Sequence, residues 1–148
     1  MKNVVFAITL LMGGLVFGQS EKNQQKIKVP EAVKMAFQAD FPKVRAHWGM
    51  EDGGYEAEFK MNGRDASAVY DSRGHKIAFE IAVERSEVPE EAWDYILKNY
   101  ANTKITEIAR ISDDQNVVNY EVEIGMDGKS YDVLFDANGK FLKIVEGD

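Results

Sequence analysis

The feature that most constrains the fold is an internal repeat. The segment V-P-E-A-V at residues 29–33 returns as V-P-E-E-A at 88–92, Y-E-A-E-F at 55–59 returns as Y-E-V-E-I at 120–124, and V-Y-D-S-R-G at 69–74 returns as L-F-D-A-N-G at 134–139. Three matches in the same order indicate a duplicated structural unit. The repeat therefore predicts two copies, at residues 29–85 and 86–148.

Each copy is expected to begin with a helix. Pro30 and Pro89 are each followed by glutamate, and both proline and acidic residues are favoured in the first turn of a helix. The next apolar residues recur at helical spacing and define one buried face per helix: Val33, Ala36, Phe37 and Phe41 in the first copy, and Ala92, Trp93, Ile96 and Tyr100 in the second.

After each helix the apolar period changes to strict alternation, which is typical of half-buried strands. Tyr55, Ala57 and Phe59 alternate with Glu56 and Glu58, and residues 120–126 repeat the pattern. Gly-containing pairs such as Asn62-Gly63 and Asp127-Gly128 favour tight hairpin turns. The expected strands are 44–50, 55–61, 64–71, 76–84, 104–111, 120–126, 130–136 and 140–145.

These elements predict an α+β fold class with two tandem repeats, each a helix packed on a four-stranded antiparallel β-meander. The helix covers the apolar face of its meander, because a bare apolar sheet face is not stable in water. Trp93 is expected in the core. Trp48 is expected there too by alternation, the alternative being a bulge at Gly49 that turns its ring outward. The other sheet face stays open. The sequence leaves open whether the two units join their edges into one longer sheet.

The N-terminus has the layout of a secretory signal peptide. Lys2 precedes an uncharged apolar stretch at residues 4–17, and the chain turns polar at Gln19. We expect cleavage after Gly18, a short linker at 19–28, and a periplasmic or secreted protein without a membrane segment. The sequence contains no cysteine, so neither a lipid anchor nor a disulfide is expected.

The charge of the chain indicates which partners it can bind. The net charge is −7, with 25 acidic and 18 basic residues, and a negative surface repels nucleic acid and anionic lipid. Alternation places many charges on the open sheet face: Arg45, His47, Glu56, Glu58, Lys60, Glu80, Glu84, Arg110, Glu121, Glu123 and Asp132. The candidate partner-binding residues are Glu56, Glu58, Lys60, Arg64, Asp65, Glu121 and Glu123. The alternative is a solvated face that only prevents edge pairing between chains.

No catalytic or metal site is predicted. The chain has two histidines, His47 and His75, which lie in no known catalytic motif and are too few for a zinc site. Asp113-Asp114 and the segment 136–139 offer clustered oxygens to calcium, but without EF-hand spacing. Such residues usually stabilise the turn itself. We expect no cofactor.

The V-P-E helix start, the Y-E-x-E strand and the D-x-x-G hairpins together resemble the PepSY-like family, also called β-lactamase-inhibitor-like, of exported Bacteroidetes proteins. The likeness covers residue 29 to the end. It implies an exported protein that binds or inhibits another protein through its sheet and a protruding hairpin. The hairpin 62–65 lies in the same general place but has no sequence match to an inhibitory loop, so no inhibitory residue is carried over. The inhibitors also use disulfides, and this chain has none.

The resulting prediction is an exported, non-enzymatic binding module, in its sharpest form an inhibitor of a secreted hydrolase. The alternative is a small-ligand or calcium-binding sensor or carrier of the cell envelope. The partner and the oligomeric state are left open by the sequence.

Overall fold

The computed structural model describes residues 27–147 of the 148-residue chain. The predicted signal peptide, its cleavage site and most of the 19–28 linker lie outside the described residues. Within the described residues, no helix has the length and apolar character needed to span a membrane.

All eight predicted strands and both predicted helices are present, within a few residues of the expected bounds. The elements follow in this order: α1 (Glu31–Asp40), β1 (His47–Glu51), β2 (Gly54–Met61), β3 (Arg64–Tyr70), β4 (Lys76–Ala82), the 3₁₀ turn η1 (Arg85–Glu87), α2 (Glu90–Tyr100), β5 (Lys104–Asp113), β6 (Val118–Met126), β7 (Lys129–Asp136) and β8 (Phe141–Glu146). Pro30 and Pro89 are the N-cap residues of the two α-helices.

The predicted fold class of two tandem repeats, each a helix on its own four-stranded meander, is wrong. The strands form one 8-stranded antiparallel sheet in the order β1 to β8. β4 pairs with β5 from Ala78 opposite Asp113 to Ala82 opposite Ala109. The physical reason is that two separate meanders would leave both strands with unpaired backbone N–H and C=O groups, and pairing satisfies them. The fold is α+β. The two four-stranded segments join through β4 and β5, a pairing that the sequence left open.

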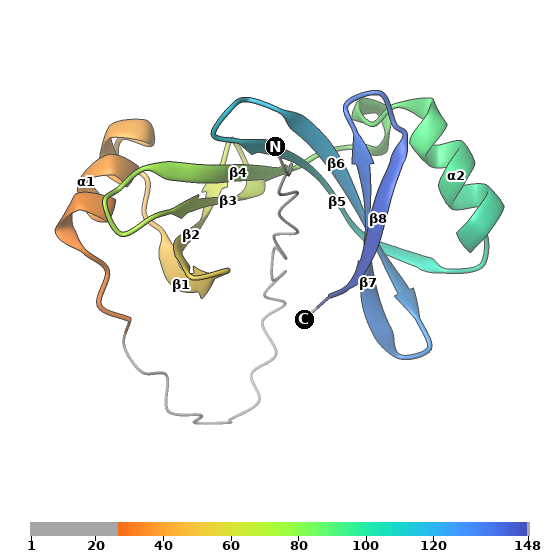
Figure 1. Cartoon of the computed structure of the whole chain (residues 1–148), viewed down its shortest axis with the longest axis horizontal. Helices are drawn as coiled ribbons and strands as arrows, with labels where there is room; N and C mark the ends of the chain where they lie inside the picture. The colour runs from red at the N-terminus through yellow and green to blue at the C-terminus, as the bar shows by residue number, and fades with distance from the viewer. Residues whose placement is uncertain (1–26, 148) are drawn as a thin grey trace.

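Both helices pack on the same face of this sheet. Ile81 belongs to the cluster around α1, and its cross-strand neighbours Arg110, Tyr120 and Phe135 lead across the sheet to the cluster around α2. Figure 1 shows the sheet arched between the helices, which lie on its outer side. Opposite the helices the arch has a second face, which we call the inner face.

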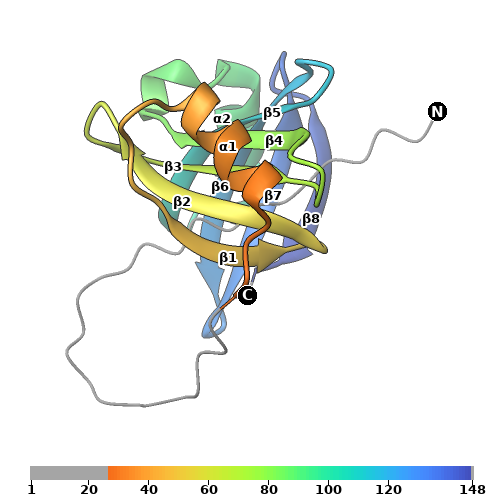
Figure 2. The same cartoon turned by 90° about the vertical axis from the view of Figure 1, so that its left-hand side faces the viewer.

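The helix-side core has two parts. Around α1, Val33 and Phe37 pack against apolar residues of β2 to β4, and the Phe37 and Trp48 rings lie 5.4 Å apart. α1 lies over these strands in Figure 2. Around α2, Ala92, Trp93 and Ile96 pack against β6 and β7. The predicted core positions of both tryptophans are confirmed.

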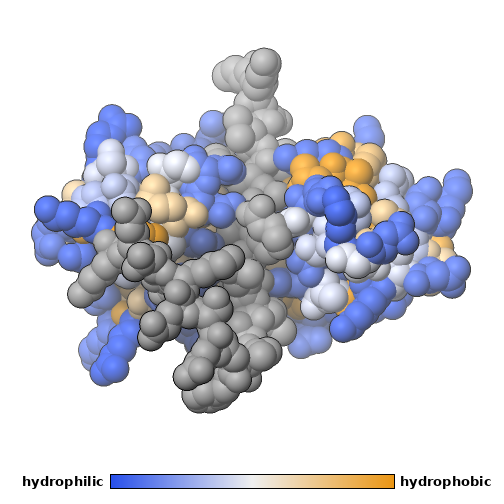
Figure 3. Space-filling view, turned by 90° about the horizontal axis from the view of Figure 1, so that it is seen from below, coloured by the Kyte–Doolittle hydropathy of each residue, from blue (hydrophilic) through white to orange (hydrophobic). Residues whose placement is uncertain are grey.

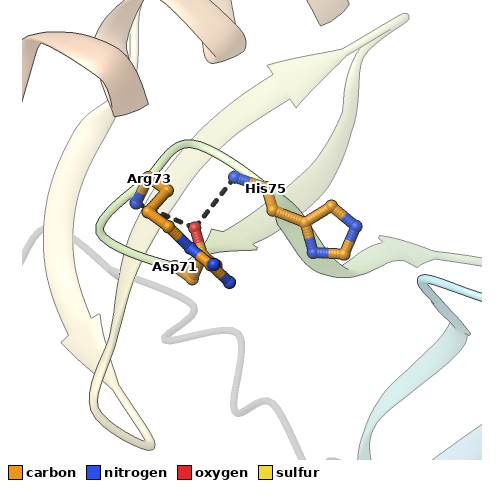
Figure 4. A network of polar contacts seen from close by, with 3 residues as sticks. All are labelled: Asp71, Arg73 and His75. Carbon is orange, nitrogen blue, oxygen red and sulfur yellow. Dashed lines mark hydrogen bonds and ion pairs between the residues drawn. The ribbon is translucent and has the colours of Figure 1, made fainter.

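The D-x-x-G hairpins hold the helices on the sheet. At the β3–β4 turn, Asp71 Oδ1 accepts hydrogen bonds from the backbone N–H groups of Arg73 (2.8 Å) and His75 (3.0 Å), as Figure 4 shows. Gly74 follows with a φ of +85°, and a Cβ there would lie 2.6 Å from the Ala32 carbonyl oxygen. The turn therefore touches α1 closely, and only glycine fits.

Candidate binding face

Acidic side chains of strands between β2 and β7 share the inner face. The cross-strand register places Glu58 opposite Ser67, Ser67 opposite Glu80, Glu107 opposite Glu123 and Glu123 opposite Asp132. Because side chains alternate along a strand, Glu56 and Glu121 lie on the same side. The inner face therefore carries acids from β2, β4, β5, β6 and β7.

Four of these acids form a group that we call the inner carboxylates: Glu56, Glu80, Glu107 and Glu121. Glu56, Glu80 and Glu121 have exposed fractions of 5%, 0% and 2%. Each of the four has at least one buried carboxylate oxygen without a hydrogen-bond partner among residues 27–147, and in Glu80 this holds for both oxygens. Buried polar groups are normally paired, so this group needs an explanation.

Burial and mutual repulsion change the protonation of the inner carboxylates. Burial, together with the neighbouring charges of Glu58 and Glu51, raises the pKa of Glu56 from 4.5 to about 7. Burial, followed by the charges of Glu123, Asp65 and Asp132, raises the pKa of Glu107 to about 8. The pKa values of Glu80 and Glu121 are also raised well above the ordinary value, by burial first and then by neighbouring acids. At neutral pH the group therefore binds protons in the absence of another cation.

The basic residues near this face do little to neutralise it. Lys143 lowers the pKa of Glu121, but burial and acidic neighbours outweigh that effect. Lys60 forms an ion pair with Asp65 at 2.7 Å near the β2–β3 turn. Arg64 bonds Glu87 of η1 at 2.8 Å and 3.1 Å. Lys60 and Arg64 are thus engaged by Asp65 and Glu87 near the β2–β3 turn.

The predicted candidate residues divide into two groups. Glu56, Glu58, Glu121 and Glu123 all lie on the inner face. Lys60, Arg64 and Asp65 surround the β2–β3 turn, and the Arg64 guanidinium is held by Glu87. Arg64 and Asp65 also line the pocket described below, whereas the four glutamates do not.

The structure corrects two expectations about this face. It is not uniformly solvated, since Glu56, Glu80, Glu121 and Asp132 are buried. Arg110, expected on the open face, lies on the helix side, because it pairs with Ile81 and Tyr120.

Glu107 was not predicted, although it is central to the inner carboxylates. A register shift between Ile105 and Glu107 interrupts the β5–β6 ladder. The surrounding sequence has isoleucine at 105, 108 and 111, so both possible faces of the strand contain apolar residues and the alternation does not identify one of them.

A pocket of about 360 Å³ opens where β4 leaves the sheet. Its lining comes from the β2–β3 turn at Gly63, the end of β4 and the first half of β5. The lining includes the apolar residues Ala82, Ile105 and Ile108 and the acidic residues Asp65, Glu84 and Glu107. The pocket thus joins the predicted hairpin 62–65 to the inner carboxylates.

The calcium candidates are engaged in turns. Asp113 Oδ1 accepts backbone hydrogen bonds from Gln115 and Val117, and Asp136 Oδ1 accepts them from Asn138 and Lys140. Within the described residues, no group of three or more His, Cys, Asp or Glu side chains is arranged to hold a metal ion. The geometry gives these aspartates a role in the turns.

The described surface is mostly polar in the view from below. It is largely hydrophilic, with hydrophobic areas on both halves and the larger one on the right (Figure 3). Large apolar side chains with exposed surface include Leu97 on α2, and Leu142 and Ile144 on β8. They are scattered over several elements, which is common on soluble domains.

Comparison with known proteins identifies both a family and a fold. A family model described as "putative beta-lactamase-inhibitor-like, PepSY-like" matches residues 50–143. No curated protein matches the chain.

Three solved structures of Bacteroides proteins share the fold. A putative periplasmic protein from Bacteroides eggerthii has a TM-score of 0.72 at 17% identity, covering 81% of this chain and 90% of its own. A DUF2874 family protein from Bacteroides uniformis has a TM-score of 0.71 at 20% identity, covering 80% and 90%. A BLIP-like protein from Bacteroides fragilis has a TM-score of 0.64 at 17% identity, covering 84% and 92%. At these identities the likeness shows a common fold.

Proposed function

The chain belongs to the PepSY-like, beta-lactamase-inhibitor-like family, and from that premise we propose that it is an exported, non-enzymatic binding module whose inner face binds a basic surface of another protein. The single observation that carries this proposal is the group of inner carboxylates. Four acids with unpartnered oxygens meet on one sheet face, and a bound cationic group would satisfy them.

Energetics favour binding over a purely structural role for these acids. Burial of carboxylates that have no hydrogen-bond partner costs folding free energy, whether they are charged or protonated. Here the charges of Glu107 and Glu121 both raise the pKa of Glu80. A basic partner would replace that repulsion with attraction, and electrostatic complementarity of this kind also speeds association.

An exported location and a hydrolase as the partner are the finer parts of the proposal. The apolar segment at residues 4–17 supports export, and the fold is shared with a protein described as putative periplasmic. The family description supports an inhibitor of a secreted hydrolase as the sharpest version. An arched acidic face suits a convex basic surface near such an enzyme's substrate cleft.

Affinity capture tests the proposal. The mature chain from Gln19 is used to capture proteins from the envelope and culture fluid of the producing cell. The disrupting variant reverses two half-buried inner-face charges, Glu58→Lys with Glu123→Lys, and spares the fully buried Glu80. The control, Asp94→Lys with Asp114→Lys, changes the net charge equally on exposed residues of α2 and the β5–β6 turn.

We expect the wild type and the control to retain one protein in stoichiometric amount and the inner-face variant to lose it. Circular dichroism of all three proteins checks that they are folded. Equal capture by the inner-face variant would rule out the inner face as the binding surface.

A further inference from the structure

The stretch that follows the predicted cleavage after Gly18 combines positive charge with hydrogen-bond donors. Residues 19–26 read Q-S-E-K-N-Q-Q-K, with two lysines, one glutamate, four side-chain amides and no apolar residue. Cleavage adds an α-amino group, so the segment carries a charge of about +2 in a chain whose net charge is −7. We call residues 19–26 the N-terminal tail.

The inner carboxylates lack donors of this kind. Glu80 is fully buried with neither carboxylate oxygen hydrogen-bonded within residues 27–147, and Glu121 is buried with one such oxygen. A buried carboxylate without a partner costs free energy, and a donor would recover it. Ammonium groups, side-chain amides and backbone N–H groups can all donate to a carboxylate. The tail therefore offers the groups that this face needs.

The described chain starts at the edge of the sheet from which the inner face is reached. Ile27 packs against the α1 core. The segment that leads into α1 lies beyond the β1 edge of the sheet in both Figure 1 and Figure 2. β1 borders β2, which carries Glu56 and the half-buried Glu58. The tail is thus joined to the chain on the side where the acids of the inner face begin.

The tail is long enough to cross this face as far as β4. Its eight residues span at most about 27 Å when extended. Glu80 on β4 is three strands away from β1, which is about 14 Å at the usual strand spacing of about 4.8 Å. The remaining length of about 13 Å is enough to pass round the edge strand.

We infer that the N-terminal tail occupies the inner face of the free protein, with its cations and amides directed at Glu58 and the inner carboxylates, and that a partner displaces it. Tethering favours the contact, because a segment on a short flexible linker has an effective concentration in the millimolar range. Two lysines do not neutralise four inner carboxylates, so the face keeps charge for a partner. The displacement rests on the proposed function, whereas the contact itself does not.

Paramagnetic broadening of amide signals tests the contact directly. The chain has no cysteine, so Ser20→Cys places a single spin label on the tail of the ¹⁵N-labelled mature chain from Gln19. Lys22→Gln with Lys26→Gln removes the side-chain cations of the tail. Lys98→Gln with Lys140→Gln removes two exposed cations elsewhere and is the matched control.

We expect the label to broaden the amide signals of β2 to β4, including Ser67 and Glu80, and to leave those of β8 unchanged. The broadening should be lost in Lys22→Gln/Lys26→Gln and retained in the control. It should also be lost at a salt concentration of about 1 M, where the Debye length is about 3 Å.

Three results would overturn the inference. The first is broadening that is no greater on β2 to β4 than on β8. The second is broadening that survives the loss of both tail lysines. The third is broadening of a ¹⁵N-labelled chain without a spin label by a separate spin-labelled chain, because the tail of a second copy would then be the occupant.

Failure of the tail contact is distinguishable from failure of the proposed function. A partner that is lost with Glu58→Lys/Glu123→Lys, in a protein whose tail label broadens no inner-face signal, keeps the binding module and removes the tail contact. Lysine-dependent broadening with no protein captured keeps the tail contact and removes the protein partner. Where both are found, Lys22→Gln/Lys26→Gln should bind the captured partner more tightly than the wild type, and equal or weaker binding would remove the displacement.

Discussion

The inner carboxylates are held in a protonation state that no isolated glutamate has at neutral pH. Glu56 and Glu107 have pKa values of about 7 and about 8, against an ordinary 4.5. The groups that face them come from the whole width of the sheet: Glu51, Glu58, Asp65, Glu80, Glu121, Glu123, Asp132 and Lys143. Most are acids, so repulsion adds to burial.

The free energy of unfolding is expected to fall as the pH rises from about 5 to about 8. Below the ordinary pKa, both the folded and the unfolded states hold these protons. Above it, the unfolded chain releases them first, so a rising pH favours unfolding until the folded-state pKa values are passed. Asp71 and Glu87 have lowered pKa values and are ionised in both states across this range.

Urea unfolding at four pH values between about 5 and 8 measures this effect. Glu80→Gln with Glu107→Gln serves as the comparison and should show a smaller slope, because two of the titrating acids are gone. A wild-type midpoint that is constant or increases with pH would refute the explanation by burial and repulsion.

At the scale of elements, the contact between a helix and a glycine turn fixes each helix on the sheet. A Cβ at Gly74 would lie 2.6 Å from the Ala32 carbonyl oxygen, and one at Gly139 would lie 2.8 Å from the Ala92 nitrogen. Each contact joins the first half of an α-helix to a hairpin more than 40 residues later in the chain. The D-x-x-G motif is thus a packing element as well as a turn.

Gly74→Ala is expected to destabilise the protein by about 3 kcal/mol, because a left-handed backbone costs a non-glycine residue about 1–2 kcal/mol and overpacking adds about 1–3 kcal/mol. Gly53→Ala is the matched control, since Gly53 also has a positive φ but nothing within 4 Å of its Cβ position. It should cost only the backbone part. Thermal or urea unfolding compares the two, and equal losses would exclude the close contact with α1.

The elements that local signals define could be predicted from the sequence. The helix starts at Pro30 and Pro89, and the alternation at 55–61 and 120–126, correspond to observed elements because each depends on residues close in the chain. The β4–β5 pairing could not be predicted, because its partners are separated by η1 and α2 and no turn residue specifies their register. The burial of Glu56, Glu80 and Glu121 could not be predicted either, because alternation along a strand assigns a side chain to a face and does not show whether it is buried.

At the scale of the whole molecule, the β4–β5 pairing connects two helix-side cores into one structure. Val83, just after β4, packs against both cores. On the inner face a third cluster joins Val69, Ala78, Ile111 and Leu134 across the centre of the sheet. The two halves of the sheet therefore cannot separate at most positions without exposing apolar surface of both halves to water.

We therefore expect the protein to unfold in a single cooperative transition. The two tryptophans provide separate reporters, since Trp48 packs in the α1 core and Trp93 in the α2 core. In Trp93→Phe only Trp48 fluoresces, and in Trp48→Phe only Trp93 does. In each variant the fluorescence midpoint in urea should match the midpoint from far-UV circular dichroism. Separate midpoints would show that the two halves unfold independently.

The unpartnered carboxylates of the inner face have opposite effects on the stability of the unbound protein and on its ability to bind a cation. Replacing one of these carboxylates would relieve repulsion and desolvation and raise the free energy of unfolding of the protein without a bound cation. It would also remove a charge that can attract a cation. Stability alone does not account for Glu80, which is buried without a hydrogen-bond partner among the described residues. The unpartnered carboxylates lower the stability of the unbound protein, and a bound cationic group would restore it.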